Sequence, residues 1–215
     1  MYITHLKIDN FAFESVENFN YLGPILNEDN TMNIEIAERI AKGNKAYCAN
    51  VKLIKSKFLK KNTKINIYKT VIRPVVTYSS ETWTLTAKYE NNLRIFERQI
   101  LRKISGPVNT DNIWRIRNNM EIDKLIEGAD TVRFIKAQRI EWLGHIQKMD
   151  QARRTRKLLD WKPMGIRPVG RPRQRWQEDV MGNLKKLKVK YWKETAEDRR
   201  IWRDLAEREK THRGR

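Results

Sequence analysis

The 215-residue chain has too few thiols and imidazoles for the common disulfide and zinc frameworks. It contains one cysteine, Cys48, and three widely separated histidines, His5, His145 and His212. A single cysteine cannot form a disulfide within the chain, and thiolate zinc sites need several. No histidine has a partner at a metal-ligand spacing, so we interpret His145 as a packing or hydrogen-bonding residue.

Targeting and membrane-spanning segments are also absent from the sequence. The opening residues, MYITHLKIDNFAF, lack the basic start and long apolar run of a secretory signal. No apolar run approaches the length of a bilayer span. These absences predict an intracellular protein, nuclear or cytoplasmic with the nucleus preferred, that has no membrane partner.

Carboxylates are scattered rather than clustered. No Asp-Asp pair occurs, whereas polymerases and metal nucleases need grouped carboxylates to hold divalent cations. There is no Gly-x-x-x-x-Gly-Lys phosphate loop. Ser80 and Glu81 have no histidine near them in sequence, so packing and capping explain them better than catalysis. The sequence therefore predicts no catalytic residue, no metal site and no cofactor in this chain.

The chain does have a large excess of positive charge. Its formal net charge is +19, and residues 151–215 hold 21 Lys and Arg against 9 Asp and Glu. This balance indicates a polyanionic partner, with nucleic acid (RNA, DNA or their hybrid) as the first candidate. A basic helix on a membrane surface is the competing use of such charge. We disfavour it, because no segment pairs a clean basic face with a broad apolar one.

Residues 165–176, GIRPVGRPRQRW, are the most distinctive basic segment. Glycine and proline keep its first half out of helix and strand, which predicts an extended loop entering a helix at about Gln174. Guanidinium groups on such a loop suit phosphate oxygens. A solvated loop without a ligand is an equal alternative from these residues alone. GRPR also resembles an AT-hook core, but Val169 replaces the usual preceding arginine. The candidate nucleic-acid-binding residues here are Arg167, Gly170, Arg171, Arg173 and Arg175.

Apolar spacing predicts a mainly α fold with a short N-terminal β-hairpin, a helical bundle and a smaller basic helical unit. The hairpin pairs residues 2–8 with 16–22 around Asp9 and Asn10. Long helices are expected over 30–58, from 62 to a break or kink at Pro74, 87–105, 129–149, 174–187 and 192–209. The polar outer face of the 129–149 helix would carry Arg133, Lys136, Gln138 and Arg139. Short helices are expected within 108–128, and a short strand at 158–161. The first helix would be capped by Thr31 or Asn33, and Glu35 would pair with Arg39 one turn further on. Its inward residues would be Ile34, Ala37, Ala41, Cys48, Val51 and Phe58. The expected divisions are 1–28, 29–106, 107–150 and 151–215.

Six segments in order carry a family resemblance. They are FNYLGPIL, IAERIAKGNKA, KINIYKTVIRPVVTYSSETWTL, ILRKISGP, RIEWLGHIQKMD and GIRPVGRPRQRWQEDV. Together they resemble the C-terminal part of the reverse transcriptase of LINE-type (non-LTR) retrotransposons, over roughly residues 15–205. One departure is Ser79-Ser80, where the family usually shows Tyr-Gly.

The resemblance implies specific roles. Phe19, Tyr21, Leu22 and Gly23 would belong to a primer grip at the base of the palm. Residues 30–105 would form a thumb that straddles the template–primer, and the remainder a post-thumb region. The thumb lysines proposed to contact nucleic acid are Lys42, Lys45, Lys52 and Lys55, with a solvated helix face as the alternative.

The resemblance also implies what this sequence does not carry. The Tyr-x-Asp-Asp carboxylates with their magnesium, and the family's endonuclease, would lie upstream of everything present. Three hypotheses follow. The chain is a binding module, a piece that supports RNA-directed DNA polymerase activity with a separate palm-containing segment, or a non-functional retroelement relic.

Overall fold

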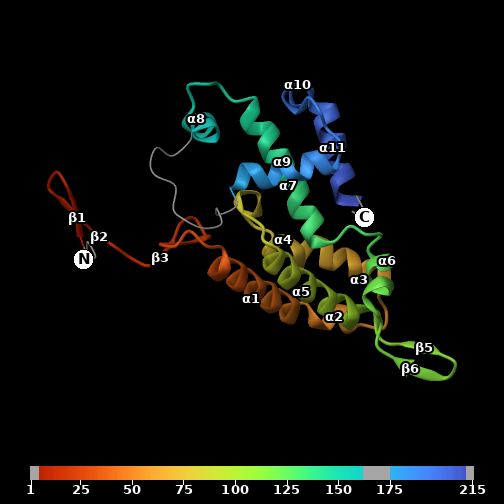
Figure 1. The fold of residues 1–215 in the computed structure, drawn as a ribbon. Coiled ribbons are helices and arrows are strands. Elements are labelled where there is room, and N and C mark those ends of the chain that lie inside the picture. The colour runs from red at the N-terminus through yellow and green to blue at the C-terminus, as the bar shows by residue number, and fades with distance from the viewer. Residues whose placement is uncertain (1–4, 162–174, 212–215) are drawn as a thin grey trace.

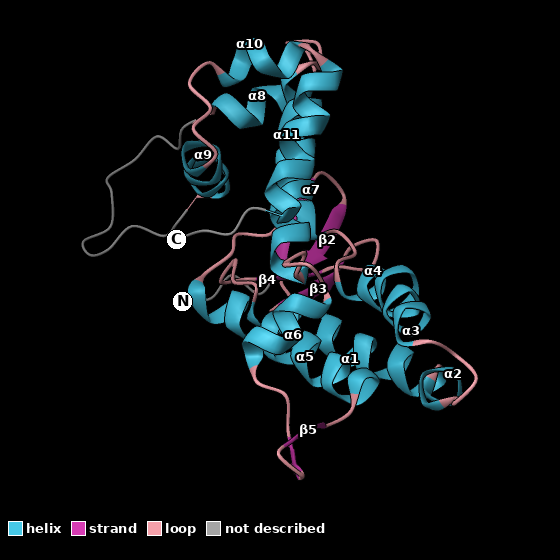
Figure 2. Ribbon diagram, turned by 90° about the vertical axis from the view of Figure 1, so that its right-hand side faces the viewer, coloured by secondary structure: helices cyan, strands magenta, loops and turns pink. Residues whose placement is uncertain are grey.

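A computed structural model describes residues 5–161 and 175–211 (Figure 1). This part of the chain is mainly helical, with three short pairs of antiparallel strands. Two clusters of helices meet at one long helix, α7 (Thr131–Gln147), which contributes residues to both apolar cores (Figures 1 and 2). The mainly α fold class predicted from the sequence is therefore confirmed.

Two small hairpins precede the helices. Strands β1 (His5–Ile8) and β2 (Phe11–Glu14) pair around Asp9 and Asn10, and β3 (Asn18–Asn20) pairs with β4 (Ile25–Asn27). The predicted turn is correct, but the predicted pairing of 2–8 with 16–22 is wrong. Asp9 adopts a φ of 53°, and Ile8 pairs directly with Phe11, so the chain reverses within two residues. The next segment along the chain therefore becomes the partner.

The first cluster is built from helices between residues 33 and 105. Its elements are α1 (Asn33–Ala49), α2 (Val51–Lys55), α3 (Lys61–Ile67), the π-helical turn η1 (Tyr68–Ile72), α4 (Arg73–Val76), the 3-10 turn η2 (Ser80–Thr82) and α5 (Ala87–Ser105). The predicted 30–58 helix breaks at Asn50, whose side chain donates to the Ala46 carbonyl. It does not bend at Gly43. That glycine is buried where an added Cβ would lie 2.7 Å from Cζ of Phe96, so close packing explains it.

The buried face of α1 differs from the predicted one. Ile36 is 1% exposed and Tyr47 7%. Five of the six residues predicted to point inward are instead exposed, so these predictions are wrong for Ile34, Ala37, Ala41, Cys48 and Phe58. The stripe that faces the core includes the ion pair of Glu35 and Arg39. A search for apolar spacing alone cannot find a face that contains two charged residues. The predicted caps Thr31 and Asn33 are also wrong, since Met32 precedes the helix without a side-chain cap.

Pro74 is accommodated without ending the helical segment. The π-helical turn η1 precedes it, and Pro74 then occupies the first turn of α4, where its missing N–H removes no internal bond. The predicted break is therefore a local widening of the helix.

Helix α5 agrees with its predicted pattern. Thr86 caps it, Leu93, Phe96 and Ile100 are buried, and Gly106 ends it with a φ of 69°. The short helices predicted in 108–128 are only partly correct. Strands β5 (Val108–Thr110) and β6 (Ile113–Arg115) form a hairpin, and a helix, α6 (Asn119–Leu125), follows.

The second cluster contains α8 (Arg154–Asp160), α9 (Trp176–Lys186), α10 (Trp192–Glu197) and α11 (Arg199–Thr211). The strand predicted at 158–161 is wrong, because that segment lies in and after α8. The predicted 192–209 helix is divided at Asp198, whose carboxylate accepts the N–H groups of Arg200 and Ile201. His145 on α7 is exposed, with its ring centroid 5.3 Å from that of Trp142.

Candidate nucleic-acid interface

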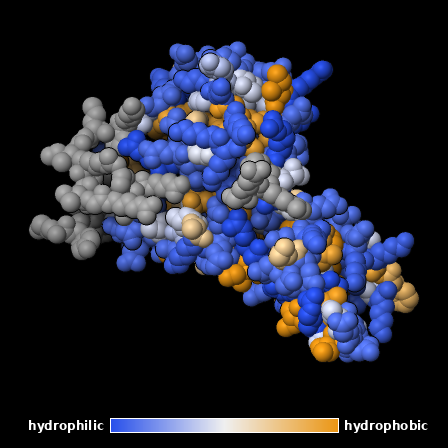
Figure 3. All heavy atoms as spheres, turned by 45° about the vertical axis from the view of Figure 1, so that its right-hand side comes forward, coloured by the Kyte–Doolittle hydropathy of each residue, from blue (hydrophilic) through white to orange (hydrophobic). Residues whose placement is uncertain are grey.

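The longest acid-free segment of the chain runs through much of the first cluster. From residue 39 to residue 80 there are nine lysines and two arginines but no aspartate or glutamate. The segment comprises most of α1 and all of α2, α3, η1 and α4. Most of the described surface on the face drawn in Figure 3 is hydrophilic. A segment with so many cations and no acidic residue of its own attracts polyanions strongly.

The four predicted thumb lysines all belong to this segment. Lys45, Lys52 and Lys55 are exposed, whereas Lys42 is half-buried and its Nζ lies 3.5 Å from a carboxylate oxygen of Glu38. The three exposed side chains form no ion pair with any described residue. Lys42 is therefore the least available of the four.

The structure adds cations that the sequence reasoning missed. Lys57, Lys60 and Lys61 are exposed around the turn that joins α2 to α3, and none forms an ion pair within the described ranges. We call the exposed side chains at positions 45, 52, 55, 57, 58, 60 and 61 the lysine-rich tip. The absence of acidic residues was readable in the sequence and could have indicated it.

Phe58 stands at the centre of the lysine-rich tip. Its side chain is 98% exposed, although the helical pattern predicted it to point inward. Helix α1 ends at Ala49 and α2 ends at Lys55, so the helical spacing counted from α1 no longer applies at residue 58. Ile54 and Ile65, which are 2% and 6% exposed, anchor the two helices on either side. An aromatic ring is thus held in solvent among lysines, and such a ring can pack on a sugar or a base.

The turn at residues 19–23 lies on a different part of the cluster. Phe19, Tyr21 and Leu22 are 55%, 58% and 78% exposed, and Gly23 has a φ of 106°. The Tyr78 hydroxyl donates to the Leu22 carbonyl at 3.2 Å.

Helix α1 holds the neighbouring strand through a buried ion pair. Glu35 Oε2 accepts the Ile25 N–H at 2.7 Å, and its other oxygen lies 2.6 Å from Arg39 Nε. The Arg39 guanidinium in turn lies 4.7 Å from the centroid of the Tyr78 ring. The 19–23 turn is therefore fastened to the helices by Glu35, Arg39 and Tyr78. The sequence spacing predicted the pairing of Glu35 with Arg39, but not the contacts of this pair with Ile25 and Tyr78.

The arginine-rich loop is described only at its end. Arg167, Gly170, Arg171 and Arg173 lie outside the described residues. Arg175 is exposed and immediately precedes α9, which begins at Trp176 rather than at Gln174.

The start of α9 is fastened to the first cluster. Trp176 Nε1 donates to the Glu81 carbonyl at 2.7 Å, and Asp179 accepts the Leu85 N–H at 3.3 Å. Asp179 also lies 2.7 Å from Arg139 Nη1 of α7. Arg139 is fully buried, and this burial lowers its pKa, although Asp179 opposes the effect. The predicted polar outer face of α7 is therefore wrong at Arg139.

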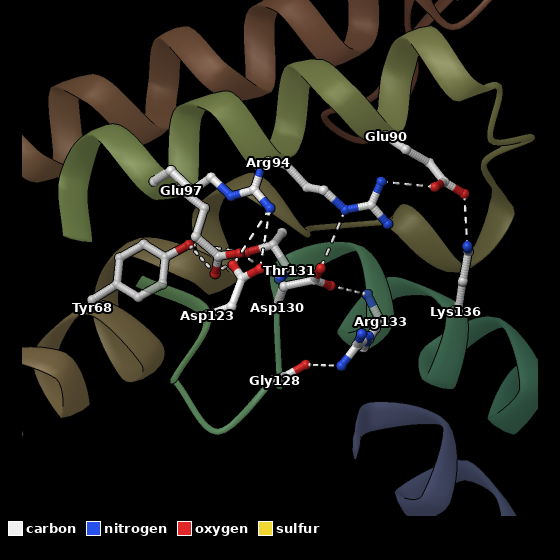
Figure 4. A network of polar contacts seen from close by, with 11 residues as sticks. Tyr68, Glu90, Arg94, Glu97, Asp123, Gly128, Asp130, Thr131, Arg133 and Lys136 are labelled. Carbon is white, nitrogen blue, oxygen red and sulfur yellow. Dashed lines mark hydrogen bonds and ion pairs between the residues drawn. The ribbon is translucent and has the colours of Figure 1, made fainter. Parts of the chain in front are cut away.

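A second polar network joins α5 to α7 (Figure 4). The Glu97 carboxylate accepts the Thr131 N–H and hydroxyl and the Tyr68 hydroxyl, all within 2.7–2.9 Å. Burial raises the pKa of Glu97 and holds the pKa of Tyr68 well above its usual range.

The carboxylates beside that network form ion pairs with arginine and lysine side chains. Arg94 lies between Glu90 and Asp130, and Lys136 lies 2.7 Å from Glu90. In the described ranges no group of three or more acidic, histidine or cysteine residues could hold a metal ion. These carboxylates hold helices together, and the tip offers charge and an aromatic ring for binding.

Comparison with known proteins relates the chain to a transposon-derived protein. The chain is 24% identical over 205 residues to an uncharacterized transposon-derived protein of Caenorhabditis elegans, covering 93% of this chain and 73% of that protein. This similarity suggests a transposon origin. No family model and no solved structure matches the chain. Among the described helices, none is long and apolar enough to cross a bilayer.

Proposed function

We propose that this chain is the nucleic-acid-binding, thumb-like portion of a LINE-type reverse transcriptase. It would hold template–primer without making bonds itself, and a separate palm-containing segment would supply the polymerase carboxylates and their magnesium. The lysine-rich tip is the observation that carries the proposal, because cations and one exposed aromatic ring gather there without local carboxylates.

The arrangement of the tip suits a duplex bound by its backbone. Its cations are spread over the end of α1, α2 and the start of α3 rather than grouped at one point. Lysine contacts phosphates without reading sequence, and an RNA–DNA hybrid offers a wide, shallow minor groove that side chains can enter. Phe58 has no polar atom and would pack against sugars in such a groove. Sequence specificity should therefore be low.

The N-terminal hairpins would carry the contact with the palm. Ile8, Phe11 and Phe13 on β1 and β2 are 52%, 70% and 51% exposed, and Figure 1 shows this hairpin standing apart from the helices. A two-stranded sheet has unpaired edges and is marginal alone, so a further sheet could extend it.

The main experiment measures how salt weakens binding. We expect an RNA–DNA hybrid bound by the intact 215-residue chain to dissociate steeply as salt rises. Replacing Lys55, Lys57, Lys60 and Lys61 with Ala should reduce the slope of log K against log salt by as much as about 4 on the duplex-DNA scale. Fluorescence anisotropy with a labelled hybrid measures both slopes.

A control variant that loses the same number of charges distinguishes direct contact at the tip from the effect of the protein's overall net charge. Lys88, Lys124, Lys148 and Lys157 are exposed, lie outside the tip and form no ion pair within residues 5–161 or 175–211. Replacing those four with Ala should change the slope by less than about 1. If both quadruple variants behave alike, the tip is not the binding surface.

The transposon-derived relative also fits a retroelement relic without a function. A relic released from selection would be free to lose its core. Cooperative thermal unfolding followed by circular dichroism would support a maintained fold, whereas a broad, non-cooperative trace would favour the relic.

A further inference from the structure

A second exposed aromatic side chain lies among lysines at the turn between α9 and α10. Lys185, Lys186, Lys188, Lys190 and Lys193 are all exposed, and Tyr191 is 73% exposed. No acidic residue occurs between Asp179 and Glu194. We call residues 185–193 the tyrosine turn. It lies far from the lysine-rich tip, since α10 and α2 are at opposite ends of the molecule in Figure 1.

The backbone of the tyrosine turn is fixed on both sides. Leu187 is 5% exposed in the second core, and Trp192 packs against the same core. Lys188 has a φ of 60°, and the next residue's N–H donates to the Leu184 carbonyl at 3.1 Å, which closes the end of α9. Thr195 donates its hydroxyl to the Tyr191 carbonyl at 2.7 Å. The Tyr191 ring is therefore held out in solvent by a rigid frame.

Several polar groups of the tyrosine turn have no partner among the described residues. Among the residues described, Lys185, Lys188 and Lys190 form no ion pair, and the Tyr191 hydroxyl forms no hydrogen bond. Lysines elsewhere are engaged; for example, Lys136 lies 2.7 Å from Glu90. Within the turn, only Lys193 has an aromatic contact, with its Nζ 5.8 Å from the centroid of the Trp192 ring.

We propose that the tyrosine turn binds single-stranded nucleic acid, with one base stacked on Tyr191 and phosphates on Lys185, Lys188 and Lys190. The inference rests on the proposed nucleic-acid function but assigns a second site and a different form of the ligand. A base in a duplex already has both faces covered, whereas a base in a single strand is free to stack on an exposed ring. The turn is short, so it can contact only a few nucleotides, unlike the extended tip.

The test uses the full chain and two probes, a labelled 12-nucleotide oligo-dT and a labelled RNA–DNA hybrid. Tyr191→Ala should weaken oligo-dT binding about five- to one-hundredfold, the range that loss of one base–aromatic stack produces. Tyr191→Phe keeps the ring and should bind within about twofold of the parent. Replacing Lys185, Lys188 and Lys190 with Ala should reduce the single-strand salt slope by about 2. Hybrid binding should be unchanged in all three variants.

Ile201→Ala is the matched control, since this side chain is 54% exposed on α11 of the same cluster. It should leave oligo-dT binding unchanged. Far-UV circular dichroism and thermal unfolding must be the same for all variants before the affinities are compared.

The outcomes separate the two proposals. Unchanged oligo-dT binding by both Tyr191→Ala and the triple lysine variant would overturn this inference, and the turn would then suit an acidic protein partner instead. If the tip variant reduces hybrid and oligo-dT binding equally while the Tyr191 variants reduce neither, there is one site, and the proposed function alone survives. If the parent chain binds oligo-dT but not the RNA–DNA hybrid, and Tyr191→Ala abolishes the oligo-dT binding, the single-strand site at the tyrosine turn is supported and the proposed thumb-like function fails.

Discussion

Gly144 offers a stringent test of how the second cluster is mounted on α7. An added Cβ would lie 2.5 Å from Cδ1 and 2.6 Å from Cε2 of Trp202, and would also crowd its Nε1. That indole is 4% exposed and donates to the Ile140 carbonyl at 2.9 Å. Gly144→Ala must therefore displace a buried ring or separate α11 from α7.

The expected loss of stability combines two costs and one smaller gain. Crowding a packed core costs about 1–3 kcal/mol, and leaving the indole N–H without its acceptor costs about 1–3 kcal/mol more. The gain in helix propensity from Gly to Ala returns only about 1 kcal/mol. We expect the free energy of unfolding to fall by about 1–5 kcal/mol, measured by urea denaturation followed by circular dichroism.

A neutral comparison and a rescue make the test decisive. Gly182 in α9 has no atom within 4 Å of an added Cβ, so Gly182→Ala should raise stability by up to about 1 kcal/mol. In the double variant Gly144→Ala with Trp202→Phe, the smaller ring should recover part of the loss. A Gly144→Ala protein as stable as the parent would refute the packing of α11 on α7.

Two further predictions concern buried charges. Burial raises the pKa of Glu209 to about 7, above its value of about 4.5 in an unfolded chain. The folded state therefore binds this proton more tightly and is favoured at low pH. That contribution to stability is lost as the pH rises from about 4.5 to 7. Glu209→Gln should remove most of that decline, at most about 3 kcal/mol, in urea unfolding measured across the pH range; an unchanged pH profile would contradict it. Asp179→Ala should lower stability by about 3–5 kcal/mol because it leaves Arg139 buried and unpaired. A second change, Arg139→Met, should restore much of the loss; equal stability of the single variant and its parent would contradict the ion pair.

Sequence reasoning succeeded where one simple rule decided the local structure. Helix α5 buries Leu93, Phe96, Ile100 and Ile104 in one apolar stripe between a threonine cap and a glycine stop. Glu97 is also buried on this helix, but the apolar residues alone define the same face, so the extent of the helix and its inward face were both predictable.

The rule failed where charged groups entered the core. The buried stripe of α1 includes Glu35, Arg39 and Gly43, which are not apolar, so the spacing of alanines and isoleucines indicated a different face. Their burial depends on the Ile25 backbone and the Tyr78 ring, which are remote in sequence. A long-range partner of this kind cannot be recognised in one sequence.

The candidate site was predicted only in part for a related reason. Three of the four predicted thumb lysines are exposed without an ion pair, but the helix break at Asn50 and the turn after Lys55 reversed the expected position of Phe58. Those breaks come from local capping, not from hydrophobic spacing. The cations beyond Lys55 could have been found by noting that no carboxylate follows Glu38 until Glu81.

The contacts of Tyr78, Glu81 and Trp176 connect segments that are far apart in sequence. Tyr78 holds the Leu22 carbonyl, and the Glu81 carbonyl, three residues further along, holds the indole of Trp176. Trp176 directly follows Arg175, the described end of the arginine-rich loop. The 19–23 turn and the end of that loop are thus attached to the same short stretch of backbone around η2. Because both segments are attached to one packed turn, the distance between them is already fixed. A nucleic acid that contacts both segments would therefore bind without the entropic cost of ordering one relative to the other.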